Sequence, residues 1–191
     1  MPLNLLSERI RNWLHRRRLG RYVLRRATER DLDFIMEEVI DGTKQGHYAE
    51  SLLDPVQTRG FREQLVNVIR HAAMLRRTER GPEQIRAWLW VYGRNGDDQV
   101  GYLLLSEKLP GSIATDIELY KVGVRKERRK DGHGRRIVQL FVTFSSPTVN
   151  LYARCFPPSE TMFKMLKEVG FSHINTMRFG TRELELCARE A

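Results

Sequence analysis

The sequence predicts an α/β domain in which strands and helices alternate along the chain. Three observations predict it. Apolar residues recur at helical spacing in two segments, a turn-rich link joins two β-rich runs, and one strand leads into a glycine loop and a helix start. At 191 residues, of which 41% are hydrophobic, the chain fits one compact domain. We expect that domain over residues 21–191, preceded by an arm over residues 1–20.

The first half of the chain is expected to contain three strands and two helices. These are a strand over 21–27, helices over 29–40 and 57–77, and strands over 87–92 and 100–105. Thr28 can cap the first helix, which we expect to stop near Gly42. Gly and Asn in the link 93–99 predict an antiparallel hairpin between the last two strands.

The second half is expected to contain four strands and two helices. These are a strand over 116–124, a helix over 134–144, a strand over 150–156, a helix over 160–168, and strands over 172–178 and 181–187. Ser159 can cap the helix that follows it, and Gly170 ends that helix in a way common for glycine.

The most informative segment is the basic glycine loop within residues 122–138. Gly132 and Gly134 allow the backbone to approach a ligand closely, and the amides that open the next helix point outward without partners. Cationic side chains surround them, namely Arg128, Arg129, Lys130, Arg135 and Arg136. The combination predicts a phosphate-binding loop. The lysine and hydroxyl residue of a P-loop and the third glycine of a dinucleotide fingerprint are both missing.

The spacing Arg129-x-x-Gly132-x-Gly134 after an apolar strand resembles the pyrophosphate motif of the GNAT superfamily of acetyl-coenzyme A (acetyl-CoA)-dependent N-acetyltransferases. The resemblance extends over residues 21–187. It implies a mixed, twisted sheet of six to seven strands flanked by helices, with acetyl-CoA in a cleft between the fourth and fifth strands. The cofactor-binding residues that it implies are Val122, Gly123, Val124, Arg129, Lys130, Asp131, Gly132, His133, Gly134, Arg135 and Ser159.

The same resemblance implies acetyl transfer to a primary amine by direct attack in a ternary complex. Glu118 stands in the fourth strand where many such enzymes carry the general base. A partly buried carboxylate can accept a proton from the amine, directly or through water. The alternative is that Glu118 is an exposed strand residue or the ion-pair partner of an arginine. The resemblance also implies that a backbone amide within residues 122–124 binds the oxyanion formed from the thioester carbonyl. The same strand edge is implied to pair with the pantetheine arm of the cofactor.

Two positions depart from the family pattern. Leu166 stands where many members carry a tyrosine that protonates the leaving thiolate, and Ser159 replaces an asparagine. Tyr152, Cys155 or Ser159 can substitute as the donor, or the thiolate leaves without help. A domain that binds CoA without turnover is a further alternative.

Acceptor specificity in such folds comes from the link after the first helix and from the last hairpin. His47 and Tyr48 lie in that link and are the candidate substrate-binding residues, and His47 can assist proton removal. The sequence leaves the acceptor open between a protein, a peptide and a small molecule. An aminoacyl-tRNA, as acetylated by GNAT toxins, is the other enzymatic alternative.

The net charge of +9 is concentrated in the first 30 residues, which hold nine arginines and two glutamates. The arm is amphipathic, so it either packs on the domain or a second subunit, as in a homodimer, or contacts nucleic acid or an anionic membrane surface. If it binds tRNA, deleting residues 1–20 should abolish acceptor binding in a salt-dependent way.

Composition also sets expectations about metals and compartment. Two distant cysteines, Cys155 and Cys187, indicate core thiols rather than a disulfide framework or a metal site. No apolar run is long enough to cross a bilayer, and the N-terminus lacks the apolar core of a signal peptide. We therefore expect a cytoplasmic protein without a metal.

Overall fold

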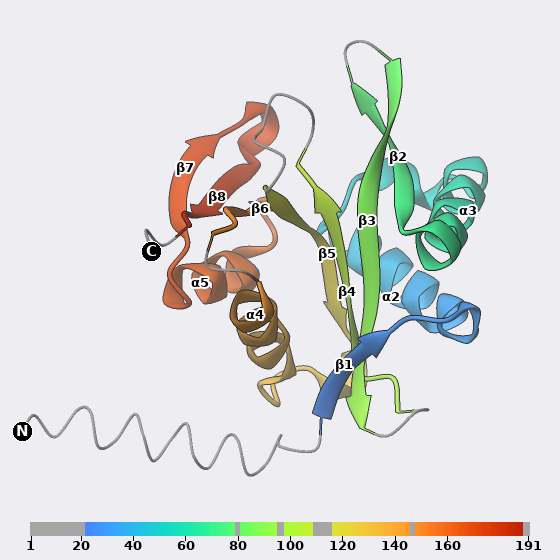
Figure 1. Ribbon diagram of the computed structural model, residues 1–191, viewed down its shortest axis with the longest axis horizontal. Helices are drawn as coiled ribbons and strands as arrows, with labels where there is room; N and C mark the ends of the chain where they lie inside the picture. Colours follow the sequence, from blue (N-terminus) through green and yellow to red (C-terminus); the bar gives the residue numbers. More distant parts are fainter. Residues whose placement is uncertain (1–21, 79–80, 95–97, 109–115, 146–147, 189–191) are drawn as a thin grey trace, which may run out of the picture.

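The structure is a computed structural model that describes residues 22–78, 81–94, 98–108, 116–145 and 148–188. The predictions for the arm over residues 1–20 lie outside these residues. Within them, strands and helices follow one another in the predicted order, with one additional strand (Figure 1).

Eight strands form one mixed sheet in the order β1-β3-β4-β5-β6-β8-β7, and β2 also pairs with β3. Their bounds are β1 Tyr22–Arg26, β2 Ala73–Thr78, β3 Gly81–Arg94, β4 Gly101–Glu107, β5 Ile117–Val124, β6 Leu151–Cys155, β7 Ser172–Thr176 and β8 Arg182–Leu186. Neighbouring strands are antiparallel except β5 and β6, which are parallel. The predicted hairpin between β3 and β4 is confirmed.

Four helices cover the two faces of the sheet. Helices α2 (Leu32–Lys44) and α3 (Pro55–His71) lie on one face, and α4 (His133–Phe144) and α5 (Glu160–Glu168) lie on the other (Figure 1). Each face has its own hydrophobic core, one with α2 and α3 and the other with α4 and α5. Burying a single apolar stripe of each helix against the sheet explains the helical spacing seen in the sequence.

The helix predicted over 57–77 is too long at its C-terminal end. Helix α3 ends at His71, because Ala72 takes a left-handed conformation with φ 52°. Residues 73–78 then form β2, which pairs with the first half of β3 and buries Met74. Pairing with the next strand of the chain decides the structure of this segment, and β2 brings the sheet to eight strands.

The first helix runs further than predicted, through Gly42 to Lys44. Gly42 is needed there for close packing rather than for a helix stop. A Cβ atom on Gly42 would lie 2.8 Å from Cε2 of Tyr48, so only glycine lets the Tyr48 ring rest on α2. The end of α2 thereby positions Tyr48, one of the predicted substrate-binding residues.

Candidate active site

A cleft opens where β5 and β6 separate. The two strands pair only over residues 117–119 and 151–153. Beyond this pairing the cleft has a volume of about 510 Å³ and is lined by the second half of β5, by β6, by α5 and by the start of α4. The cleft expected between the fourth and fifth strands is therefore confirmed.

The loop between β5 and α4 has the features of an anion cradle, and its residues Lys130, Gly132, Gly134 and Arg135 line the cleft. Gly132 has φ 84°, a conformation that glycine adopts without steric cost. Helix α4 starts at His133, and its first turn closes with a bond from Arg136 N to the Gly132 oxygen at 3.0 Å. The amides of Gly134 and Arg135 thus have no partner within the helix. With the cationic Lys130, which also lines the cleft, they form a site suited to phosphate.

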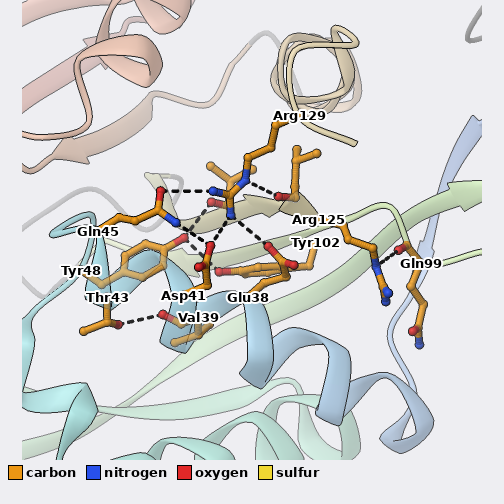
Figure 2. A network of polar contacts seen from close by, with 12 residues as sticks. Glu38, Val39, Asp41, Thr43, Gln45, Tyr48, Gln99, Tyr102, Arg125 and Arg129 are labelled. Carbon is orange, nitrogen blue, oxygen red and sulfur yellow. Dashed lines mark hydrogen bonds and ion pairs between the residues drawn. The ribbon is translucent and has the colours of Figure 1, made fainter. Parts of the chain in front are cut away.

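The Arg129 side chain ties this loop to α2. Its guanidinium donates to Asp41 at 2.7 Å and to Glu38 at 3.2 Å, and its Nε donates to the Val124 oxygen at 2.9 Å (Figure 2). Burial raises the pKa of Glu38, and Arg129 offsets part of that rise. Arg129 lines the cleft as predicted, but its charge is used to hold the loop against α2.

Two predicted loop residues do not line the cleft. The His133 ring is buried, 4.8 Å from the Tyr22 ring and 5.7 Å from the Tyr92 ring. Asp131 is exposed, outside the cleft. The first turn of α4 directs the His133 ring into the core, so neither side chain lines the cleft. Binding of a diphosphate by the backbone amides of this loop, which is what the motif implies, stays a prediction. Arg135 does line the cleft and forms an ion pair with Glu168 of α5.

Glu118 is an ion-pair partner rather than a cleft-lining side chain. It is 3% exposed, and its two oxygens accept from Arg76 at 2.6 Å and from Arg154 Nε at 2.8 Å. Arg154 lines the cleft, whereas Glu118 does not. The ion-pair alternative describes this arrangement, and the role of Glu118 as a general base stays a prediction.

Tyr48 connects the segment after α2 to β5. Its hydroxyl donates to the Val122 oxygen at 2.7 Å and lies 2.9 Å from the Tyr102 hydroxyl (Figure 2). Burial raises the pKa of Tyr48 to about 12, so the phenol stays protonated at neutral pH. The carbonyls of Val122 and Val124 are thus engaged by Tyr48 and Arg129, and both residues line the cleft together with Gly123.

His47 and Ser159 form a polar pair across the cleft. The two residues are 112 positions apart in sequence, yet His47 Nδ1 lies 3.1 Å from Ser159 Oγ. Burial lowers the pKa of His47, which favours the neutral imidazole. Both residues line the cleft. The structure therefore joins a residue predicted to bind the acceptor with one predicted to bind the cofactor.

The candidate proton donors for a leaving thiolate lie in different surroundings. Leu166 is fully buried and also lines the cleft, so its position offers no donor. Tyr152 donates its hydroxyl proton to Glu185 at 2.5 Å and does not line the cleft. Cys155 and Ser159 do line it, and burial raises the pKa of Cys155 to about 11. Both Cys155 and Ser159 are thus protonated cleft residues that can donate, and Ser159 also has a polar partner in His47.

Lys121 is a cleft residue that the sequence analysis missed. Leu104 and Leu105 of β4 lie opposite Lys121 and Leu119, so Tyr120 is an extra residue that forms a bulge in β5. The bulge breaks the alternation of faces, and the side chains of Tyr120 and Lys121 both lie on the α2 and α3 side. Lys121 is 8% exposed and lines the cleft. No turn or glycine signal in the sequence marks this bulge.

The remaining expectations concern metals, thiols and membranes. Among the described residues, no three His, Cys, Asp or Glu side chains lie together as a metal ion would require. Cys155 is a buried thiol as predicted, whereas Cys187 is exposed because it follows the last residue of β8. No helix in the described part of the chain combines the length and apolar character needed to cross a bilayer.

Comparison with known proteins supports the fold assignment. Spermidine N-acetyltransferase from Vibrio cholerae, solved with CoA and spermine, is 12% identical with a TM-score of 0.63 over 88% of this chain and 96% of that chain. Ribosomal-protein-alanine N-acetyltransferase from Brucella melitensis is 19% identical with a TM-score of 0.61, over 86% and 99%. An acetyltransferase from Thermus thermophilus is 18% identical with a TM-score of 0.58, over 86% and 96%.

No protein-family model matches the sequence, and no curated protein matches it either. The structural similarity nevertheless covers nearly the whole of each of these three chains. This chain therefore has the fold of the GNAT N-acetyltransferases.

Proposed function

We propose that this protein transfers an acetyl group from acetyl-CoA to a primary amine in a ternary complex. One observation carries the proposal. The same cleft has a cradle of amides and cations at one end and His47, Tyr48 and Lys121 along its wall. The cradle suits the diphosphate of CoA, and the polar wall suits an amine that must lose a proton.

The residues present fit acetyl-CoA. Lys130, Gly132, Gly134 and Arg135 would hold its diphosphate, and the β5 backbone from Val122 to Val124 would border its pantetheine arm. When bound, acetyl-CoA supplies an acetyl group activated as a thioester. The free strand edge of β5 offers main-chain donors for the oxygen that becomes negative during the reaction.

In this proposal, Ser159 and His47 assist departure of the thiolate. A Ser159 hydroxyl donating to sulfur would stabilise the developing negative charge, and His47 would hold the hydroxyl through its bond at 3.1 Å. This pair takes the place of the tyrosine that Leu166 replaces. Because the hydroxyl gives its one proton to sulfur, His47 would carry a proton on Nδ1 and donate it to the Ser159 oxygen, as a neutral imidazole can.

A second candidate is a domain that binds CoA without turnover. Two observations favour it, namely the aliphatic Leu166 in the cleft and the double ion pair that occupies Glu118. Both candidates need the phosphate cradle, but only the enzyme needs an amine. The acceptor class, including aminoacyl-tRNA, and the partner of the arm remain proposals.

Release of free thiol from acetyl-CoA, followed with a dithiol reagent, separates the two candidates. Three amines serve as acceptors: spermidine, a peptide with an N-terminal alanine and a peptide containing lysine. We expect thiol release that rises with the concentration of at least one amine, and a Ser159→Ala variant that lowers kcat by about tenfold. Thiol release that no amine accelerates would exclude the enzymatic proposal and leave the binding domain.

A further inference from the structure

We propose that Lys121, rather than Glu118, accepts the proton that the acceptor amine loses before it attacks the thioester. This inference rests on the proposed acetyl transfer and assigns one residue to its first step. Lys121 would act as a neutral amine in the resting site. The argument comes from its position, its neighbours and the positions of competing groups.

Lys121 and Glu118 differ in their position relative to the cleft. Lys121 lines the cleft, next in sequence to Val122, whose backbone borders the same space. Glu118 does not line the cleft, and both of its oxygens already accept from guanidinium groups. A general base must come within hydrogen-bond reach of the amine, directly or through one water. Lys121 lines the cleft in which the amine would bind, so it can meet this requirement without a rearrangement of the ion pairs.

The surroundings of Lys121 disfavour its charged form. Nζ lies 3.9 Å from the ring centre of Tyr48, 5.2 Å from that of Tyr120 and 5.5 Å from that of Phe61. No carboxylate in the described part of the chain forms an ion pair with it. These rings give some cation–π stabilisation, but they replace the water that an ammonium group needs.

Charged groups face Lys121 from β5 and β2, and one more lies on β6. Glu118 of β5 favours the charged form, while Arg76 of β2 opposes it, and Arg154 of β6 pairs with the same Glu118 carboxylate. Helix α3 contributes the apolar Phe61 and the end of α2 leads to Tyr48, which stays a neutral phenol. Burial, the largest effect, outweighs the charge of Glu118 and, together with the positive charge of Arg76, lowers the pKa of Lys121 to about 7. Near neutral pH a large fraction of Lys121 therefore carries a lone pair.

The reaction balances with Lys121 in this role. The acceptor enters as R–NH₃⁺ and gives one proton to Nζ, which becomes an ammonium group. The resulting R–NH₂ attacks the thioester carbonyl, so that a C–N bond forms and the C–S bond breaks. The second proton leaves the nitrogen for the sulfur, giving an N-acetyl amine and free thiol. Lys121 then returns its proton to water through the cleft.

The first test is the pH dependence of kcat/KM for the amine with the fastest thiol release, measured for wild type and for Lys121→Arg. Arginine keeps the positive charge but cannot act as a base near neutral pH. In wild type, kcat/KM should rise with pH near pH 7 as Lys121 loses its proton. In Lys121→Arg we expect kcat/KM to fall about 100-fold and this rising limb of the pH profile to be lost. Affinity for CoA, measured by calorimetry, should be unchanged. Lys44→Arg, an exposed lysine outside the cleft, is the matched control and should keep full activity.

Each other outcome has a definite meaning. Lys121→Arg with nearly wild-type kcat/KM, or with the limb near pH 7 intact, would overturn the proposal while leaving acetyl transfer in place. Glu118→Gln that alone removes this limb would overturn it in favour of Glu118. If no amine is acetylated, the proposed function fails first, and the role of Lys121 fails with it.

A second measurement does not depend on turnover. Wild-type protein carrying lysine isotope-labelled at Cε can be titrated by NMR, with the Lys121 signal assigned from its absence in Lys121→Arg. We expect this signal to titrate near pH 7, whereas an exposed lysine titrates at about pH 10.4. Titration of Lys121 with the exposed lysines would overturn the proposal.

Discussion

Lys121 occupies a position where its charge is costly. It is 8% exposed, surrounded by aromatic rings and close to Arg76, which is itself committed to Glu118. A lysine side chain is seldom buried without an ion-pair partner, and those that are often have a functional role. The same features that make Lys121 suitable as a proton acceptor should therefore reduce the stability of the folded state.

Lys121→Met should raise the free energy of unfolding, and the gain should depend on pH. The pKa of Lys121 is lowered from 10.5 to about 7, so the unfolded chain binds one more proton than the folded protein between these values. Below about pH 7 the penalty for burying the charge is complete, and it disappears as the pH approaches 10.5. Since one pKa unit corresponds to about 1.4 kcal/mol, we expect a gain of a few kcal/mol near pH 6 that shrinks towards pH 10. Urea unfolding of both proteins at the two pH values checks this.

The comparison of wild type with Lys121→Met isolates the effect of Lys121, because every other titrating group is common to both proteins. Lys44→Met controls for the loss of a lysine at an exposed position of α2, where we expect little change at either pH. A gain for Lys121→Met that is the same at both pH values would show that only hydrophobic packing has changed. Lys121 would then be charged in the folded protein.

Helix α2 and the loop before α4 act as one unit because Arg129 joins them. Its side chain reaches Glu38 and Asp41 on α2, and Gln45 just after that helix accepts at 3.2 Å (Figure 2). Glu38 is buried, so it depends on this guanidinium for a counter-charge. The anion cradle thus takes its position from a helix that lies on the opposite face of the sheet from α4.

Arg129→Lys should weaken both the fold and the binding of CoA. A lysine has no planar fork and cannot satisfy Glu38, Asp41 and the Val124 oxygen together. We expect the free energy of unfolding to fall by about 1–3 kcal/mol and the affinity for CoA to fall about tenfold. Urea unfolding and calorimetry measure the two effects.

Arg62→Lys provides the matched control. Arg62 pairs with Asp33 at the exposed surface between α2 and α3, where an ion pair contributes little. Both measurements should be nearly unchanged in that variant. An Arg129→Lys protein that binds CoA as tightly as wild type would show that the loop is held by its backbone alone.

At the scale of the molecule, the described part of the chain contains two cores that share one sheet. One core packs α2 and α3 against the sheet, and the other packs α4 and α5 against it. The cleft lies where β5 and β6 separate, so side chains from both sides reach it. His47 and Ser159 show this most clearly, since they come from different sides and meet at 3.1 Å.

Much of the fold was readable from the sequence, because helices and strands with local signals formed as predicted. The loop from Arg129 to Gly134 and the hairpin of β3 and β4 are examples. Strand β2 was missed because its conformation depends on pairing with β3 rather than on its own residues. The bulge at Tyr120 was missed for the same reason, and with it the cleft position of Lys121. The ion pairs of Glu118 also depend on strands that are distant in sequence.

Calorimetric titration with acetyl-CoA is the most direct test of the claim that the cleft between β5 and β6 holds this molecule. We predict one molecule bound per chain, with a dissociation constant on the order of 1–100 μM. Lys130→Glu, a charge reversal in the cradle, should weaken binding at least about tenfold, whereas Lys167→Glu on the exposed side of α5 should not. Absence of binding, or binding that Lys130→Glu leaves unchanged, would contradict the account.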